Sequence, residues 1–109
     1  MRNKYKLPWH IKQYVKKELM DYKGNRNLLE KCKKAQGNTR DLILIKTRLT
    51  QIENVFERLY KEEREAAELI FFDHYSQPRA EIAKGISKSC YYYTMDKVIY
   101  LTAAEMELI

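Results

Sequence analysis

The most regular feature of the sequence is a heptad seam, a set of apolar residues in the stretch Thr39–Tyr60 with alternating spacings of three and four. Its members are Leu42, Ile45, Leu49, Ile52, Phe56 and Leu59. This spacing gathers all six side chains on one side of an α-helix, whereas a strand would divide them between two faces. The seam therefore predicts a long helix that must bury one side against another helix.

The rest of the chain favours the same class of structure. Only three glycines and two prolines occur among 109 residues, and the 45% hydrophobic content is enough for a modest core. We predict an all-α protein with an N-terminal helical hairpin or coiled coil over residues 1–60. A C-terminal helix-turn-helix follows over residues 61–109.

The N-terminal half offers the heptad seam a partner. Residues 8–22 predict a helix with one apolar stripe, and the following KGNRN segment predicts a bend or break. Trp9 is expected to pack the first turn onto the body of the protein, with stacking on a base as the alternative. The seam pairs either with residues 8–32 of the same chain or with a second copy, which would make a homodimer.

The C-terminal half carries the signals of a short helix, a turn and a longer helix. Residues 61–75 predict a supporting helix with Ala66, Leu69 and Ile70 facing inward. Pro78 suits the first turn of a helix, Gly85 suits a turn, and the hydroxyl of Ser87 suits a helix cap. In a helix-turn-helix of this order, the second helix enters the DNA major groove.

The same pattern sorts the side chains of this unit into two groups. Ile82 and Ala83 are expected to face the core, together with the stripe Tyr91, Met95, Val98 and Thr102. The candidate DNA-binding residues are Arg79, Lys84 and Lys97 near phosphates, and Lys88, Ser89, Tyr92 and Tyr93 at base edges and backbone. A cluster of tyrosines equally suits a surface for a protein partner.

The net charge of +6 is unevenly distributed along the chain. Residues 1–38 contain eleven Lys or Arg and three acidic residues, residues 39–75 contain six and eight, and residues 76–109 contain four and four. The basic excess is therefore N-terminal, and the candidate DNA-binding segment is nearly neutral, although a phosphate-binding surface is usually basic. Whether the basic N-terminal helix contacts DNA is left open by the sequence.

No pattern for catalysis or for a cofactor occurs. Cys32, Cys90, His10 and His74 are isolated from one another, so no metal site is predicted. No nucleophile, metal or phosphate-cradling motif indicates an enzyme. No segment has the length and apolarity of a membrane span or a secretory signal, so we expect a cytoplasmic protein without a membrane partner.

Four segments in order resemble the small phage transcriptional regulators of the ArpU/RinA type. They are LPWHIKQYVKKELMDY, LILIKTRLTQIENVFERL, KEEREAAELIFFDHY and EIAKGISKSCYYYTMDKVIYLTAAEM. The resemblance implies control of transcription through a helix-turn-helix similar to the fourth region of sigma factors. Double-stranded DNA and RNA polymerase are the partners that it implies.

Two departures from that pattern bear on affinity. Only three residues separate Ala83 from Ser87, where the family has about five, and Tyr93 stands where the family has a basic residue. With the neutral charge of the segment, they predict weak DNA binding by one copy. A dimer or a polymerase contact would supply the remaining free energy.

Two other classes of protein fit the same sequence. One is a helical interaction module in which the heptad seam and the tyrosines bind a partner protein without DNA. The other is a small terminase subunit that assembles into a ring, for which mass in solution is the discriminating measurement.

Overall fold

The computed structural model of the chain describes the backbone of residues 5–34 and 40–109. Within these ranges it describes every side chain except those of residues 32–34 and 40–41. Every regular element in these ranges is helical. The elements are α1 (Trp9–Met20), α2 (Tyr22–Lys34), α3 (Arg40–Glu57), α4 (Lys61–Ala67), the π-helical turn η1 (Glu68–Phe72), α5 (Gln77–Lys84) and α6 (Lys88–Glu105). The predicted all-α class is confirmed. No helix in these ranges has the length and apolarity needed to cross a membrane.

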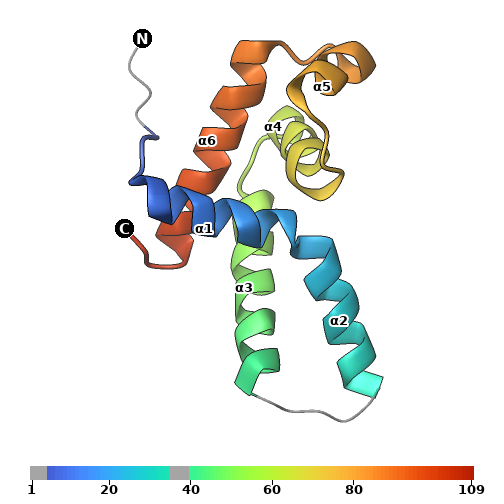
Figure 1. Cartoon of the computed structure of the whole chain (residues 1–109), viewed down its shortest axis with the longest axis vertical. Coiled ribbons are helices and arrows are strands. Elements are labelled where there is room, and N and C mark those ends of the chain that lie inside the picture. Colours follow the sequence, from blue (N-terminus) through green and yellow to red (C-terminus); the bar gives the residue numbers. More distant parts are fainter. Residues whose placement is uncertain (1–4, 35–39) are drawn as a thin grey trace.

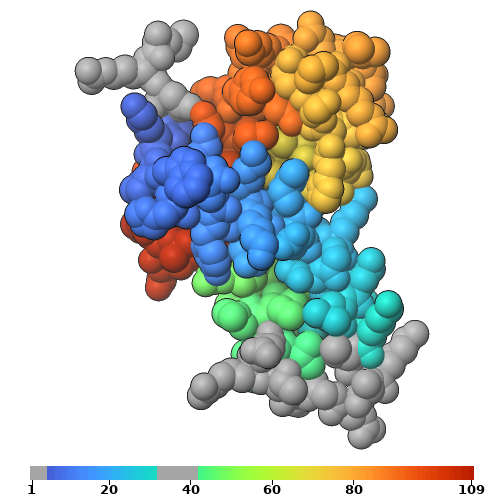
Figure 2. Space-filling view, in the orientation of Figure 1, coloured from blue at the N-terminus to red at the C-terminus, as the bar shows by residue number. Residues whose placement is uncertain are grey.

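The helices form an elongated body measuring 48 × 31 × 23 Å (Figure 1). The α1 helix crosses the middle of the molecule, and α2 and α3 extend side by side from it as an arm. At the opposite end, α5 lies next to the start of α6. The space-filling view shows α1 lying across one face of the molecule, with the start of α6 above it (Figure 2).

One hydrophobic core joins the N-terminal and C-terminal helices. Val15 and Leu19 of α1 are fully buried with Val55 of α3, Phe71 of η1 and Val98 of α6. Apolar burial is the main favourable contribution to folding, so these five residues are central to holding α6 in place relative to the rest. The core draws on both of the ranges 1–60 and 61–109.

The heptad seam is mostly used within the single chain. Leu49, Ile52, Phe56 and Leu59 are buried, whereas Leu42 and Ile45 are only partly buried. The side chains of η1 and α6 share the core with Ile52, Phe56 and Leu59 of the seam. A second copy could therefore use only the first turns of α3 without displacing the chain's own packing.

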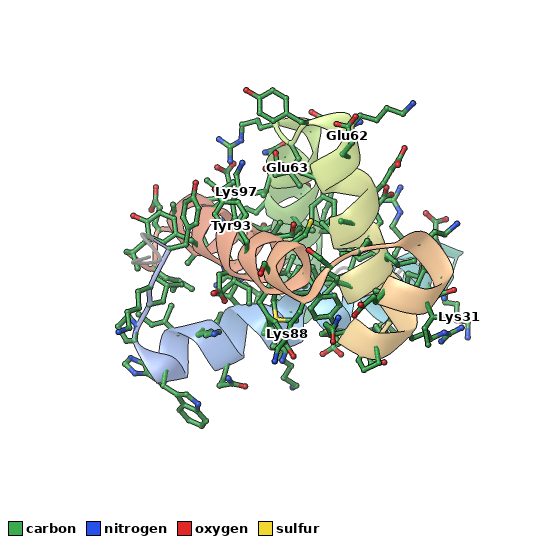
Figure 3. All side chains as sticks on the ribbon, turned by 90° about the horizontal axis from the view of Figure 1, so that it is seen from above. Lys31, Glu62, Glu63, Lys88, Tyr93 and Lys97 are labelled. Carbon is green, nitrogen blue, oxygen red and sulfur yellow. The ribbon has the colours of Figure 1, made fainter. Side chains whose placement is uncertain are left out.

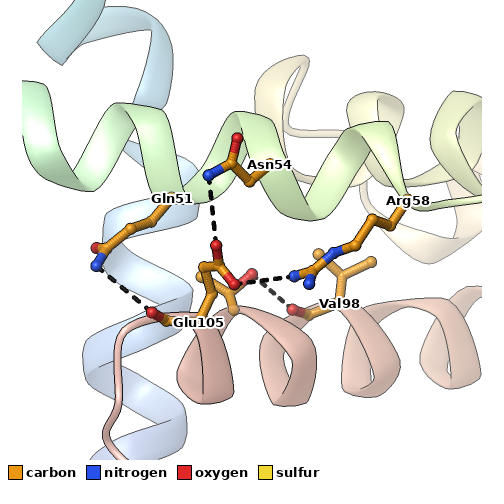
Figure 4. A network of polar contacts seen from close by, with 6 residues as sticks. Gln51, Asn54, Arg58, Val98 and Glu105 are labelled. Carbon is orange, nitrogen blue, oxygen red and sulfur yellow. Dashed lines mark hydrogen bonds and ion pairs between the residues drawn. The ribbon is translucent and has the colours of Figure 1, made fainter.

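A polar network also holds the C-terminal end of α6 against α3 (Figure 4). The Glu105 carboxylate accepts a hydrogen bond from Asn54 Nδ2 at 3.4 Å and pairs with Arg58 at 3.1 Å. The Gln51 amide donates to the Glu105 carbonyl at 3.5 Å. Because these groups are partly exposed, they orient the two helices more than they stabilise them.

Two expectations for the N-terminal half are wrong in detail. The first helix ends at Met20 and the second begins at Tyr22, so the break precedes the KGNRN segment, which is helical. Trp9 does not pack the first turn onto the core, because its side chain is 75% exposed. Leu7 and Ile11 take that place, since both pack against the core beside the start of α1.

Inward packing of residues 61–75 follows the prediction, as Ala66, Leu69 and Ile70 are buried. The sequence places His74 in the loop before Pro78 and predicts a loop hydrogen bond for it. Its Nε2 lies 2.8 Å from the Met20 carbonyl, and its φ is 57°. The sequence predicts a loop over residues 31–38, but α2 continues through Lys34. Residues 35–38 and the side chain of Cys32 lie outside the described residues.

Candidate nucleic-acid interface

The short helix α5 begins and ends at sharply defined positions. The Ser76 hydroxyl accepts a hydrogen bond from the Arg79 amide at 3.4 Å, and Pro78 lies in the first turn. At the other end, Gly85 adopts a left-handed φ of 68°, and its amide donates to the Glu81 carbonyl at 2.9 Å. The chain therefore leaves α5 abruptly, and only residues 85–87 connect it to α6.

Helix α6 is capped in the same way as α5. The Ser87 hydroxyl accepts a hydrogen bond from the Cys90 amide at 3.2 Å. In the next turn, the buried Tyr91 hydroxyl donates to the Tyr75 carbonyl at 2.6 Å, and burial raises the pKa of Tyr91. These contacts fix the start of α6 against the segment that precedes α5.

The two faces of α6 have opposite environments. Tyr91, Met95, Val98 and Thr102 are all buried, as the sequence predicted. The other face is exposed in its first two turns. The exposed residues there are Lys88, Ser89, Cys90, Tyr92 and Tyr93.

Helical spacing divides the exposed face into two rows. One row contains Lys88, Tyr92 and Asp96, and the other contains Ser89, Tyr93 and Lys97, each at intervals of four residues. Seen along α6 from its start, Lys88 points to the side on which α1 lies, whereas Tyr93 and Lys97 point toward the side of α4 (Figure 3). The predicted site residues therefore do not share one flat surface.

Three predicted cations surround the connection between α5 and α6. Arg79, Lys84 and Lys88 are exposed, and none forms an ion pair with an acidic residue in the described part of the chain. The Arg79 guanidinium lies 3.9 Å from the centre of the Tyr75 ring, a cation–π contact that restrains its direction. These three charges are available to an anionic partner.

Lys97 differs from the other predicted cations. Its ammonium group lies 2.5 Å from the Glu63 carboxylate of α4, and the Lys97 side chain is only 19% exposed. The hydrogen bond to Glu63 raises the pKa of Lys97. The expected phosphate contact is therefore corrected: this side chain joins α6 to α4, because its row faces α4.

The expected direction of Ile82 and Ala83 is also wrong. Ile82 is 89% exposed and Ala83 is exposed, while Ala80 is the fully buried residue of α5. Ile82 lies about 200° around the helix axis from Ala80, so both cannot face the core. Because α5 is only eight residues long, its apolar pattern was too short to fix its rotation.

Two contacts between the N-terminal segment and α6 were not predicted from the sequence. Lys12 of α1 pairs with Asp96 at 3.2 Å. The Tyr5 ring lies edge-on to Tyr93, with centroids 5.7 Å apart, and against Tyr100 at 5.4 Å. Opposite charge at Lys12 and Asp96 was a possible signal, but a pair this far apart in sequence cannot be chosen without the fold.

Among the described residues, no group of three or more His, Cys, Asp or Glu side chains is placed to hold a metal ion. Comparison of the chain with protein-family models, curated proteins and solved structures finds no match.

Proposed function

We propose that the chain is a phage-type transcriptional regulator in which α5 and α6 form a helix-turn-helix that binds double-stranded DNA. The observation that carries the proposal is the exposed start of α6, which is capped by Ser87 and rigidly backed by the core. An α-helix with side chains is about 10–12 Å across, and the major groove of B-DNA is about 12 Å wide. The exposed turns of α6 are therefore of the right size to enter that groove.

The exposed side chains supply the two kinds of contact that DNA recognition needs. Arg79 and Lys84 would bind phosphates and set the orientation of the unit. Lys88 and Ser89 offer hydrogen bonds to base edges, and Tyr92 offers a hydroxyl and an apolar ring. Tyr93 would act at the edge of the interface, since Tyr5 already contacts its ring.

Few cations lie on this unit, so one copy would bind DNA weakly. RNA polymerase or a second copy would add the missing free energy. The heptad seam leaves Leu42 and Ile45 for a homodimer, because the other four residues are buried.

Binding of a labelled random-sequence duplex, followed by fluorescence anisotropy at several salt concentrations, tests the proposal. The wild type should bind at low salt and lose affinity as salt rises. The double variant Lys88→Ala/Tyr92→Ala should bind at least about tenfold more weakly, since it removes one cation and one exposed ring from the start of α6.

The matched control is Lys31→Ala, which removes an exposed cation from α2, in the arm that extends away from α5 and the start of α6 (Figure 1). It should bind DNA nearly as well as the wild type. Absence of binding at low salt, or equal binding by the double variant and the wild type, would refute the proposal.

A helical interaction module without DNA binding is the second candidate, and exposed Ile82 favours it. Ile82 of α5 is 89% exposed and Tyr92 of α6 is 47% exposed, and exposed apolar and aromatic side chains on two adjoining helices suit a protein-binding surface more than a phosphate-binding one. In that case Ile82→Ser would abolish binding to the partner protein and would not change any affinity for DNA. The mass of the free protein in solution separates both candidates from a ring-forming terminase subunit.

A further inference from the structure

An ion pair joins the basic helix α1 to the exposed face of α6. Lys12 Nζ lies 3.2 Å from Asp96, and their side chains are 39% and 22% exposed. Asp96 is the third member of the row that begins with Lys88 and Tyr92. A carboxylate in this row would repel a DNA phosphate, so the position of Lys12 is electrostatically important.

The residues next to Lys12 on α1 are also suited to an anionic partner. Helical spacing puts Trp9 and Lys16 on the same side of α1 as Lys12, at i−3 and i+4. Lys16 is partly exposed and has no ion pair with an acidic residue in the described ranges. Trp9 is 75% exposed. One side of α1 therefore presents cationic and aromatic groups beside α6.

We propose that α1 is a second DNA-binding element, in which Lys16 contacts a phosphate next to the groove that α6 enters. Lys12 acts with it by neutralising Asp96. This inference rests on the proposed function and identifies the nucleic-acid backbone as the ligand of α1. Lys12 is a positioning residue, since it acts through the charge of Asp96.

The Lys12–Asp96 pair lies about two turns beyond the start of α6. Eight residues separate Lys88 from Asp96, which is about 12 Å along α6 at about 1.5 Å per residue. Lys16 lies about one turn, or about 6 Å, along α1 from Lys12.

Lys16→Ala and Lys17→Ala form a matched pair that tests the inference. Each substitution removes one positive charge from the last turns of α1, but Lys17 points about 100° away from Lys16 around the axis. Lys16→Ala should weaken binding of random-sequence duplex about fivefold and lower the slope of log K against log salt by about 1. Lys17→Ala should leave both quantities within about twofold of the wild type. Equal losses from both variants, or none from Lys16→Ala, would overturn the inference.

Asp96→Asn gives a second test of opposite sign. Removing the carboxylate should tighten DNA binding about threefold or more, because Lys12 is then released toward phosphate. Lys12→Ala should weaken binding, and Asp96→Asn should restore part of that loss in the double variant. If the pair were only structural, Asp96→Asn would bind no more tightly than the wild type, and that result would contradict the proposal.

Trp9 is the only tryptophan in the chain and provides a direct readout of binding at α1. Its emission should change as duplex is added, with the same midpoint as the anisotropy of the labelled DNA. Saturated anisotropy with unchanged Trp9 emission would overturn the role of α1 while leaving the role of α6 intact. Absence of any DNA binding by the wild type would instead refute the proposed function, and the inference with it.

Discussion

Helix α6 presents one face to the core and the other to solvent, and the two faces have different chemistry. The inner face contains Met95, Val98 and Ile99, which are all buried. The outer face of the first two turns contains Lys88 and Tyr92, which are exposed. Such a division is general for amphipathic helices, but here the exposed face is rich in tyrosine and includes a half-buried acid.

One helix can therefore be fixed by packing along its length and still offer a free surface at its start. The core holds α6 along its length, and Ser87 and Gly85 set where it begins. Binding by a preformed, rigid surface avoids the cost of ordering side chains and backbone. Substitutions on the inner face should therefore affect stability, and those on the outer face should affect binding.

The largest expected effect is the difference in stability between an alanine variant of buried Ile99 and one of exposed Tyr92. Ile99→Ala should lower the free energy of unfolding by about 2–5 kcal/mol, because it leaves a cavity where the side chain was buried. Tyr92→Ala should change it by less than about 0.5–1 kcal/mol, since the ring is 47% exposed. Urea unfolding of both variants checks this, and equal losses would show that the outer face is also structural.

The next effect concerns the connection that orients the outer face. Gly85→Ala should cost about 1–2 kcal/mol of stability, since a φ of 68° is unfavourable for any residue with a Cβ. Gly24→Ala is the matched control: Gly24 lies inside α2 with open space where a Cβ would lie, and alanine should stabilise that helix by up to about 1 kcal/mol. Thermal unfolding of the two variants should move in opposite directions, and a stabilising Gly85→Ala would contradict the turn geometry.

A smaller effect is expected at Tyr91, the buried neighbour of Tyr92. Tyr91→Phe keeps the ring and removes the hydrogen bond to the Tyr75 carbonyl, so it should cost about 1 kcal/mol of stability. Tyr92→Phe should cost nothing measurable on the same scale. A neutral Tyr91→Phe would show that this bond does not fix the start of α6.

The smallest expected effect is a loss of stability at high pH, caused by Tyr22 of α2. Burial and a 2.6 Å hydrogen bond to Glu53 raise the pKa of Tyr22 to about 12, from 10.0. The folded chain therefore holds this proton more tightly than the unfolded chain. Its contribution is complete below pH 10 and is lost as the pH rises toward 12.

Denaturant unfolding across this pH interval should show the loss for the wild type and less of it for Tyr22→Phe. DNA binding below pH 10 should be the same for both proteins, because the contacts of Tyr22 are with Glu53 and Phe72, outside the proposed interface. An identical pH dependence of the two proteins would contradict the assignment of the raised pKa to Tyr22.

The sequence predicted the fold class and the buried side of the long helices, because many apolar positions repeat along each of them. Four residues of the seam and the whole inner stripe of α6 are buried as expected. Long periodic segments average over errors at single positions. The caps at Ser87 and Gly85 were predictable as well, since each depends on one residue type in a local conformation.

The sequence could not predict the rotation of α5 about its axis, nor which charged residues pair across the fold. Ile82 was predicted to be inside, but α5 is too short for its pattern to fix its rotation. The partners of Lys97 and Lys12 lie 34 and 84 residues away along the chain, so only the packing of α4 and α1 on α6 selects them. Trp9 was misplaced because Leu7 and Ile11 fill the position expected for it.

The most direct test of the central claim is an NMR titration of the isotope-labelled chain with a short random-sequence duplex at low salt. We expect the amide signals of residues 84–93 to shift first and most, and those of the α2–α3 arm to shift least. Signals from buried Val98 and Thr102 should remain nearly unchanged. The largest shifts in the arm, or none at the start of α6, would contradict the claim that α6 enters DNA.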